Sequence, residues 1–278
     1  MLIPRPTPEI IIEMMLRYKP SLFGGVPTMF VGLLNHPKFK SSKFDFIKGC
    51  LSGAAPLSLE TIRQWEEATG STIVELYGLT ETAALATFNP WRGKTKIGSV
   101  GVPVPETDCR IVDIETGEKD LKQGEAEEIL IKGPQVTQGY FRNPAATDDA
   151  ITEGWLSIGD IGYLDDEGYL FIVDRKKDVI IAGGYNIYPR EVDEVLYQHL
   201  KIQAACVVGI PDAYRGETVK AFVVLKQGET ASEEEIINFC KERLAVYKVP
   251  KMIEFREALP QTIVGKILRR ALRDEVTP

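Results

Sequence analysis

Histidine and cysteine are scarce in this sequence of 278 residues, and their scarcity excludes several kinds of site. With only His36 and His199, a histidine-based zinc site is not expected, and we find no Ser-His-Asp set. The four cysteines, at positions 50, 109, 206 and 240, show neither metal-ligand nor redox spacing. A chain of this length does not need disulfide staples, so we expect a reducing, cytoplasmic environment.

Long apolar runs and excess positive charge are also missing. No run approaches the roughly 18 apolar residues that span a bilayer, and no basic segment followed by an apolar core marks a signal peptide. Lysine plus arginine total 33 against 40 for aspartate plus glutamate, a net charge of −7. Because phosphate contacts need clustered positive charge, a general nucleic-acid binder is not expected. The ordinary share of hydrophobic residues (44%) and charged residues (26%) excludes disorder, collagen and coiled coil.

The length allows two ordinary domains or one large domain. In the first part of the chain, Phe46–Leu51 and Thr72–Leu76 are predicted strands, and Ser58–Thr69 is a predicted helix with Ser58 as its N-cap. Beyond residue 98, short strand-like runs are separated by Gly, Pro and Asp turns. From Asp174 onward, strands and helices alternate again, which predicts an α+β or α/β module of about 100 residues.

Two clusters directly follow the predicted strands of the first part. Tyr77-Gly78-Leu79-Thr80-Glu81 combines an aromatic face, a flexible glycine, a hydroxyl and a carboxylate. These groups can stack on a base, bond a phosphate and hold a hard cation, and ligand-binding loops collect at this end of strands in open sheets. The small residues Gly53-Ala54-Ala55-Pro56 would let a planar ligand lie close to the backbone. Taken alone, a plain turn explains either cluster better.

Three further groups place charge where a ligand or a hinge could use it. Asp160 follows a glycine and could accept hydrogen bonds from both hydroxyls of a ribose. The charge run Asp174–Asp178 could be a hinge, with Arg175 reaching a ligand, or a solvated surface. Lys266 precedes a basic C-terminal helix and could meet negative charge that develops on a phosphoryl or carboxylate oxygen. Most lysines near a C-terminus, however, are only solvated.

The order of these clusters along the chain resembles the AMP-forming acyl-CoA synthetases of the adenylate-forming superfamily. The resemblance extends from Pro4 to the end of the chain. Gly183-Gly184-Tyr185-Asn186-Ile187-Tyr188-Pro189 is similar to the family's glycine loop, which is used in the thioester half-reaction. Leu244-Ala245-Val246-Tyr247-Lys248-Val249-Pro250 is similar to the segment ahead of the family's catalytic lysine.

The resemblance implies a reaction in two steps and a fold in three parts. A carboxylate would attack the α-phosphate of ATP to give an acyl-adenylate and pyrophosphate, and the thiol of coenzyme A would then displace AMP. The implied fold class is α/β plus α+β. We expect a partial α/β subdomain of the large AMP-binding domain at residues 1–97, a small distorted β-barrel at 98–174, and a mobile C-terminal α+β domain at 175–278.

The resemblance also implies a role for each matching residue. The residues that would bind the nucleotide or coenzyme A are Gly53, Ala54, Ala55, Tyr77, Gly78, Asp160, Arg175, Gly183 and Gly184. Within that set, Tyr77 would stack on the adenine and Asp160 would bind the ribose hydroxyls. Thr80 would meet the α-phosphate, and Glu81 would help to hold Mg²⁺. Lys266 would bridge carboxylate and phosphate, and Lys177 would be the pivot of the hinge.

Two departures from the family pattern have consequences. Ile158 stands where the family often has threonine, so one polar contact would be absent. No Ser/Thr/Gly-rich loop ending in Pro-Lys-Gly is found in the 278 residues. Without the backbone N–H groups of such a loop around the β- and γ-phosphates, ATP would bind poorly. We therefore expect a fragment that lacks about half of the large domain, is catalytically incomplete alone, and exposes a sheet edge that favours self-association.

Three functions remain open at this point. The first is a ligase for a medium- or long-chain fatty acid, which Val26–Phe30 and Ala83-Ala84 favour by resemblance; an aryl or short-chain acid is its variant. The second keeps adenylation but transfers the acyl group to a carrier protein, which the few residues after Lys266 argue against. The third is a non-catalytic nucleotide-binding or interaction module. The missing phosphate loop favours the third function, whereas Lys266, Glu81 and Asp160 oppose it.

Overall fold

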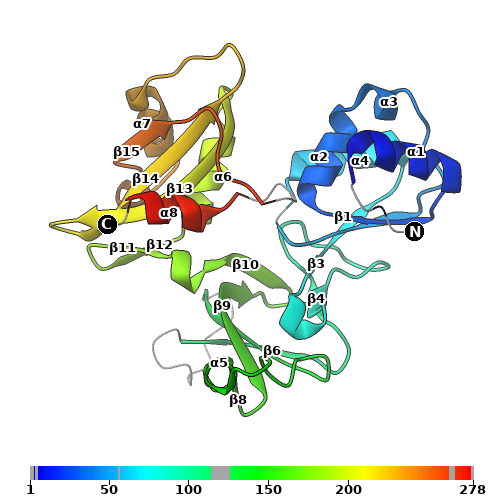
Figure 1. Ribbon diagram of the computed structural model, residues 1–278, viewed down its shortest axis with the longest axis horizontal. Coiled ribbons are helices and arrows are strands. Elements are labelled where there is room, and N and C mark those ends of the chain that lie inside the picture. The colour runs from blue at the N-terminus through cyan, green and yellow to red at the C-terminus, as the bar shows by residue number, and fades with distance from the viewer. Residues whose placement is uncertain (1–2, 4–5, 56, 114–125, 263–266, 277–278) are drawn as a thin grey trace. The chain divides into compact units, whose positions relative to one another are not determined.

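The computed structural model describes residues 3, 6–55, 57–113, 126–262 and 267–276 of the chain (Figure 1). The chain divides into two compact units. The N-terminal unit contains Met1–Ile158 and Gly162–Ile172, and the C-terminal unit contains Gly159–Ile161 and Val173–Pro278. Among the described residues, no helix has both the length and the apolar character that a membrane span requires.

The N-terminal unit begins with a five-stranded sheet on which helices pack. The strands lie in the order β1 (Leu22–Gly25), β2 (Gly49–Ser52), β3 (Ile73–Tyr77), β4 (Thr87–Phe88) and β5 (Val102–Pro103). The first three are parallel, whereas β4 pairs antiparallel with both β3 and β5. The helices are α1 (Pro8–Tyr18), α2 (Pro27–Asn35), α3 (Pro37–Lys40) and α4 (Leu59–Thr69). In this sheet β1 is a terminal strand.

Helix α4 shows how the sequence determines the helices that pack on this sheet. Ser58 accepts a hydrogen bond from the N–H of Thr61 (3.2 Å), so the predicted N-cap is confirmed. On the buried face of the helix, the ring of Trp65 meets the ring of Phe30 edge to face, with centroids 4.9 Å apart. The indole N–H donates to Ser71 Oγ (3.1 Å), so the only polar atom of the buried side chain is satisfied.

One predicted strand is shorter than the sequence suggested. The run Phe46–Leu51 predicts a strand, but β2 begins only at Gly49. The N–H of Ile47 donates to the carbonyl of Phe44 (2.9 Å), so a turn precedes the strand. Phe44 and Ile47 are nevertheless buried. The apolar run therefore marks the core at this point, and it extends beyond the strand itself.

A second five-stranded sheet follows in the chain. Its strands lie in the order β10 (Leu170–Arg175), β9 (Trp155–Leu164), β7 (Glu127–Lys132) and β6 (Asp108–Val112), and β8 (Ile151–Thr152) pairs with β9. Helix α5 (Pro144–Ala150) precedes β8. The turn between β9 and β10 has the sequence Asp165-Asp166-Glu167-Gly168, which is typical of a hairpin. It is closed by a hydrogen bond from the N–H of Gly168 to the carbonyl of Asp165 (3.0 Å).

The C-terminal unit is an α+β module around a third sheet. The sheet order is β12 (Tyr185–Ile187), β11 (Ile180–Ala182), β14 (Gly216–Leu225) and β13 (Ile202–Asp212), with β15 (Met252–Phe255) parallel to β14. The helices are α6 (Pro189–Tyr197), α7 (Glu233–Lys241) and α8 (Arg269–Val276). Pro189 is the first residue of α6, as its position in the sequence predicted.

Alternation along β13 divides this module into two cores. Ala205 and Val207 belong to the core that contains residues of α6 and α7. Cys206 and Val208 point to the opposite face and belong to the core of Leu272 in α8. Both faces of the sheet are therefore covered, which explains the continuous apolar run in this strand.

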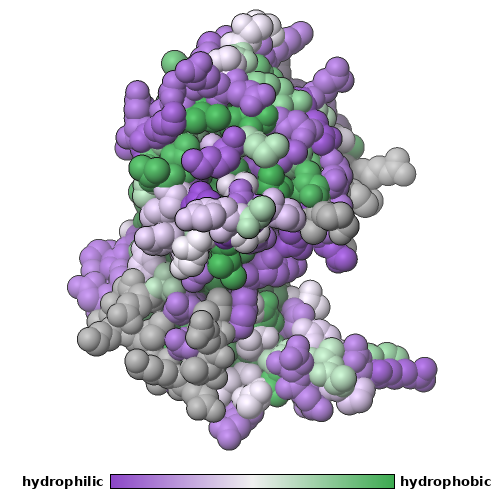
Figure 2. All heavy atoms as spheres, turned by 90° about the vertical axis from the view of Figure 1, so that its left-hand side faces the viewer, coloured by the Kyte–Doolittle hydropathy of each residue, from purple (hydrophilic) through white to green (hydrophobic). Residues whose placement is uncertain are grey.

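Several large apolar side chains of the C-terminal unit are exposed, among them Leu200, Tyr214 and Val246. On the face drawn in Figure 2, apolar residues lie in small groups between hydrophilic ones. Exposed apolar residues in small groups are ordinary on protein surfaces.

Candidate functional site

The two clusters predicted to bind a nucleotide lie at the same edge of the first sheet. Strands β2 and β3 are adjacent and parallel, and Ser52 is paired with Glu75 in their register. The segment Gly53–Ala55 leaves β2 and the segment Tyr77–Glu81 contains the end of β3 and the loop after it, so both follow the carboxyl ends of neighbouring strands. In open sheets this edge is where ligands bind. The structure thus brings together residues that the sequence places more than twenty positions apart.

A buried carboxylate of β3 contacts the chain just beyond the first loop. Glu75 Oε1 accepts a hydrogen bond from the N–H of Leu57 (3.1 Å), just beyond the Gly53–Ala55 segment. Both residues are buried. Ala54 has a positive φ of 69°, a conformation that L-residues adopt at a cost and that is common where a loop is shaped for binding. Sequence reasoning missed Glu75, because its position within an apolar strand gives no sign that its side chain meets the other loop.

The second loop depends on a close backbone approach. A Cβ atom at Gly78 would lie 2.3 Å from the carbonyl oxygen of Ala84, so no other residue fits there without a backbone shift. The loop then enters a short 3₁₀ helix, η1 (Thr80–Thr82), where Thr82 Oγ1 accepts from the N–H of Leu79 (3.0 Å). The side chain of Thr80 is exposed and is able to meet a ligand.

Glu81 is held by a neighbouring segment in two places. The hydroxyl of Tyr140 donates to Glu81 Oε1 (2.9 Å), and the N–H of Thr137 donates to the Glu81 carbonyl (2.7 Å). The pKa of Tyr140 is raised, first by this hydrogen bond and then by burial, so the phenol keeps its proton. Sequence reasoning missed Tyr140, because nothing in its local pattern connects it with Glu81.

The donor set at Glu81 fits a magnesium ion that is bound together with phosphate. Within the described residues, no group of three or more His, Cys, Asp or Glu side chains is arranged to hold a metal. Mg²⁺ commonly takes one or two carboxylates and completes its coordination with phosphate oxygens and water. One oriented carboxylate beside an exposed hydroxyl suits that arrangement and would not suit a resident metal held by protein alone.

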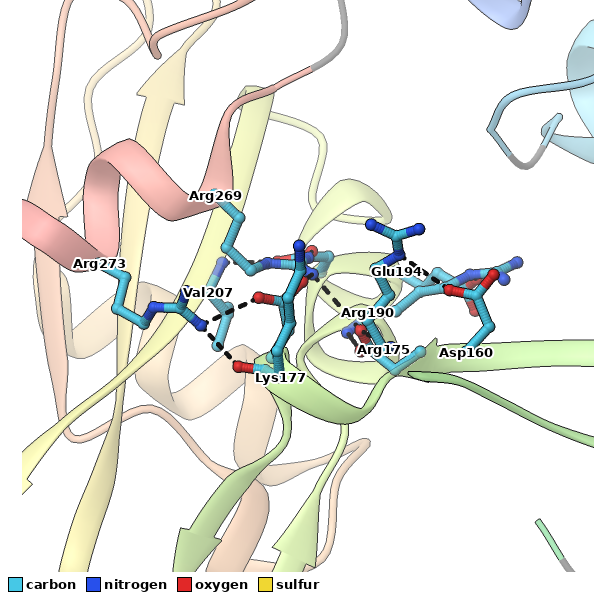
Figure 3. A network of polar contacts seen from close by, with 11 residues as sticks. Asp160, Arg175, Lys177, Arg190, Glu194, Val207, Arg269 and Arg273 are labelled. Carbon is cyan, nitrogen blue, oxygen red and sulfur yellow. Dashed lines mark hydrogen bonds and ion pairs between the residues drawn. The ribbon is translucent and has the colours of Figure 1, made fainter. Parts of the chain in front are cut away.

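In the C-terminal unit, Asp160 and Arg175 form a direct pair. Arg175 Nε donates to Asp160 Oδ1 (2.8 Å), and the carboxylate is buried while the guanidinium is partly exposed (Figure 3). The structure thus brings together the two residues that were predicted to lie near a ribose. A guanidinium that fixes one carboxylate oxygen also restricts the side chain's rotation.

The other residues of this unit that were predicted to belong to the site lie in a turn and in a short helix. Gly183 and Gly184, with φ of 61° and 82°, make the tight turn between β11 and β12. Lys177 lies in the short helix η2 (Lys176–Asp178), where its side chain is exposed. The predicted catalytic residue Lys266 lies outside the described residues.

Comparison with known proteins identifies the family. Residues 1–141 match the AMP-binding enzyme family, and residues 191–266 match the AMP-binding enzyme C-terminal domain. The chain therefore belongs to the AMP-binding enzymes, the adenylate-forming superfamily to which the acyl-CoA synthetases belong. This confirms the resemblance read from the sequence.

Curated relatives carry ligase names. A long-chain-fatty-acid–CoA ligase of Bacillus subtilis is 51% identical over 276 residues, which is 99% of this chain and 49% of that protein. A protein of the same name from Yersinia pestis is 43% identical over 272 residues, 98% of this chain and 48% of that protein. A feruloyl-CoA synthase of Amycolatopsis is 38% identical over 96% of this chain and 54% of that protein. The chain spans about half the length of the relatives it matches.

Solved structures agree on the fold. ATP-bound MatB from Rhodopseudomonas palustris superposes with a TM-score of 0.91 at 35% identity, covering 99% of this chain and 54% of that one. The anthranilate CoA ligase AuaEII, in complex with anthranoyl-AMP, gives 0.87 at 31% identity, with coverage of 99% and 54%. The predicted fold class, α/β plus α+β, is confirmed.

Proposed function

We propose that this chain provides the AMP-binding and C-terminal portions of an AMP-forming acyl-CoA ligase. The proposal is carried by one observation, the convergence of the Gly53–Ala55 and Tyr77–Glu81 loops at one sheet edge in a chain that is 51% identical to a fatty-acid–CoA ligase. ATP is the proposed nucleotide, coenzyme A the proposed acyl acceptor and Mg²⁺ the proposed metal.

The proposed chemistry has two balanced steps. A carboxylate oxygen of the acid attacks the α-phosphorus of ATP, and the bond from that phosphorus to the pyrophosphate oxygen breaks. The sulfur of coenzyme A then attacks the acyl carbon, the thiol gives up its proton, and AMP leaves with the electrons of the broken C–O bond. Negative charge increases on the α-phosphate oxygens in the first step, so groups that stabilise that charge should lower the barrier.

The residues of the two loops that follow β2 and β3 are assigned to the first step, the formation of the acyl-adenylate. Gly53, Ala54 and Ala55 would border the adenine, with Tyr77 stacked on it and Gly78 allowing the close approach. Thr80 would hydrogen-bond the α-phosphate. Glu81 would hold Mg²⁺, which when bound would neutralise phosphate charge.

Residues of the C-terminal unit are assigned to binding and to the change between the two steps. Asp160, positioned by Arg175, would accept hydrogen bonds from the ribose hydroxyls. Lys266 would bridge the carboxylate and the phosphate. A rotation of the C-terminal domain about Lys177 would then withdraw Lys266 from the reacting groups. The same rotation would present the Gly183-Gly184 loop for the attack by the thiol.

The proposed substrate is a medium- or long-chain fatty acid. The names of the Bacillus and Yersinia relatives support this choice. An aryl acid is the alternative that the names of the feruloyl-CoA synthase and the anthranilate CoA ligase favour. Transfer to a carrier protein and binding of a nucleotide without catalysis remain alternatives that the experiment below separates.

We also propose that the chain alone catalyses adenylation poorly, because its sequence contains no loop ending in Pro-Lys-Gly. The three domain boundaries, the cytoplasmic location and self-association through the exposed edge of the incomplete sheet stay predictions.

ATP–pyrophosphate exchange with Mg²⁺ tests this function. The assay would be run on the chain alone and on the chain joined to the remaining half of the Bacillus ligase, with acids from acetate to palmitate and one aryl acid. We expect exchange from the joined protein with a fatty acid, a thioester on adding coenzyme A, and loss of exchange in Lys266→Ala. AMP binding without exchange in either form would support a binding module instead, and equal exchange from both forms would contradict the incompleteness of the chain.

A further inference from the structure

A group of charged side chains joins four elements of the C-terminal unit, namely β10, η2, α6 and α8 (Figure 3). At its centre is Arg269, the first residue of α8. Its guanidinium lies 3.5 Å from Asp174 Oδ1 and 3.8 Å from Asp178 Oδ2, and it donates a hydrogen bond to Asp193 Oδ2. These aspartates belong to β10, η2 and α6, respectively. One arginine therefore connects the start of the unit with its last helix.

Two of the three aspartates are also fixed by the backbone. Asp174 Oδ2 accepts from the N–H of Arg190 (2.7 Å), and Asp193 Oδ1 accepts from the N–H of Val207 (2.8 Å). These bonds hold the carboxylates in place whether or not the arginine is present. The arginine therefore meets a preformed acceptor site.

A second arginine on the same face of α8, Arg273, contacts the end of the segment Asp174–Asp178. Arg273 Nη1 donates to the carbonyl of Lys177 (2.6 Å) and to Asp178 Oδ1 (3.2 Å). Between the two arginines, the fully buried Leu272 packs with Cys206 and other apolar residues of the sheet. Because residues three and four apart share a helix face, one side of α8 presents an apolar anchor and two cations.

The charge on Arg269 is maintained in this setting. Burial alone would lower its pKa, but the carboxylates of Asp193, Asp174 and Asp178 outweigh that effect, and the pKa is raised. Burial raises the pKa of the Asp193 carboxyl to about 7, and the guanidinium of Arg269 opposes that rise. Removing Arg269 would therefore leave a buried carboxyl group without its cation, which costs more than losing an exposed ion pair.

The contacts lie on both sides of Lys177. Arg269 holds Asp174, which precedes Lys177, whereas Arg273 holds the Lys177 carbonyl and Asp178, which follows it. We propose that Arg269 and Arg273 are positioning residues that clamp the segment Asp174–Asp178 and so limit how far the chain can turn at Lys177. The functional meaning of that turn rests on the proposed ligase function. In the sequence, α8 begins three residues after Lys266.

The clamp is testable with a protease that cuts only after lysine. Lys176 and Lys177 are exposed and lie inside the clamped segment, and replacing an arginine neither adds nor removes a cleavage site. Lys226, exposed in the turn between β14 and α7, is an internal reference in the same unit. The variants are Arg273→Met and Arg269→Met, with Arg270→Met as a matched control. The control side chain is 80% exposed, and among the described residues its ion pair is with Asp274 of its own helix.

For Arg273→Met we expect cleavage after Lys176 and Lys177 to be faster by about tenfold, because a charge-assisted hydrogen bond that restrains local opening is lost. Arg269→Met should accelerate it at least as much. Cleavage after Lys226 and all cleavage in Arg270→Met should stay within about twofold of the unchanged chain.

If Arg269→Met fails to fold, Arg273→Met decides the question alone, since it keeps the hydrogen bond from Arg269 to the buried Asp193. Unchanged cleavage at Lys176 and Lys177 would overturn the clamp. Equal acceleration at Lys226 would also overturn it, because that result indicates general destabilisation. The assay contains no ATP, acid or coenzyme A, so it gives the same answer if the ligase function proves wrong.

Discussion

Tyr140 and Glu81, 59 residues apart in sequence, are joined by a hydrogen bond of 2.9 Å from the phenol to the carboxylate. The bond restrains one oxygen of the side chain that we assign to Mg²⁺. Groups that orient a metal-binding carboxylate in this way commonly affect metal affinity as much as some ligands do.

Tyr140→Phe should therefore weaken the response to Mg²⁺. In the chain joined to the remaining half of the Bacillus ligase, we expect the Mg²⁺ concentration that gives half of the maximal ATP binding to rise by about tenfold. AMP binding without metal should stay unchanged. Calorimetric titration across a series of Mg²⁺ concentrations would measure both. Phe141→Leu is the control, since Phe141 is adjacent and 87% exposed. The same Mg²⁺ dependence in Tyr140→Phe and the control would remove Tyr140 from the site.

Gly78→Ala should disturb the loop after β3. The new methyl group would lie 2.3 Å from the Ala84 carbonyl oxygen, so the backbone must move. We expect the dissociation constant of AMP to rise by about tenfold, which is typical of an overpacked site that must shift. Gly24→Ala, in β1 of the same sheet, has no atom within 4 Å of the added carbon and is the matched control. Equal affinities in the two variants would argue against a role of this loop in AMP binding.

Trp65→Ala should destabilise the N-terminal unit alone. The side chain is fully buried and packs against Phe30, so its loss should lower the free energy of unfolding of that unit by about 3–5 kcal/mol. Leu59→Ala, on the same helix but 39% exposed, should cost less than about 1 kcal/mol. Hydrogen exchange read by peptide mass would follow each unit separately. An equal loss of protection in the C-terminal unit would show that the two units unfold together.

The four cysteines should resist alkylation in the folded chain. Cys50, Cys206 and Cys240 are buried and Cys109 is partly buried. This burial raises the pKa of Cys50 and Cys240 to about 11 and that of Cys109 and Cys206 to about 12. A raised pKa means less thiolate, so at pH 8 each group carries at least about a hundredfold less of the reactive form than an ordinary thiol.

Iodoacetamide labelling at pH 8, analysed by mass spectrometry, would test this with the chain unfolded in urea as the control. The rate in the folded chain should still be rising with pH above 9, where that of ordinary thiols levels off. A cysteine that reacts in the folded chain as fast as in urea would contradict the burial that raises its pKa.

Some site residues could be predicted from the sequence and others could not. The two groups differ in how their contacts arise. The Gly53–Ala55 and Tyr77–Glu81 clusters could be predicted, because each is continuous and directly follows a predicted strand. Two parallel strands then place both at one edge without further information. The family resemblance added the role of each residue.

Contacts that depend on tertiary packing could not be predicted in the same way. Glu75 lies within an apolar strand, and only the register of β3 with β2 places its carboxylate near the N–H of Leu57. Arg269 and Asp193 are 76 residues apart, and a basic C-terminal helix alone does not indicate which acids it will meet. The start of β2 was predicted too early for a related reason. Phe44 and Ile47 are apolar because they belong to the core that the helices help to form, although neither residue is part of the strand.

The contact between Arg273 and Lys177 places the first and last segments of the C-terminal unit beside each other. In a compact unit, first and last segments that lie beside each other are the usual condition for circular permutation, because a short linker can join them. The order of the elements along the chain could then be changed while the packing of the interior is kept.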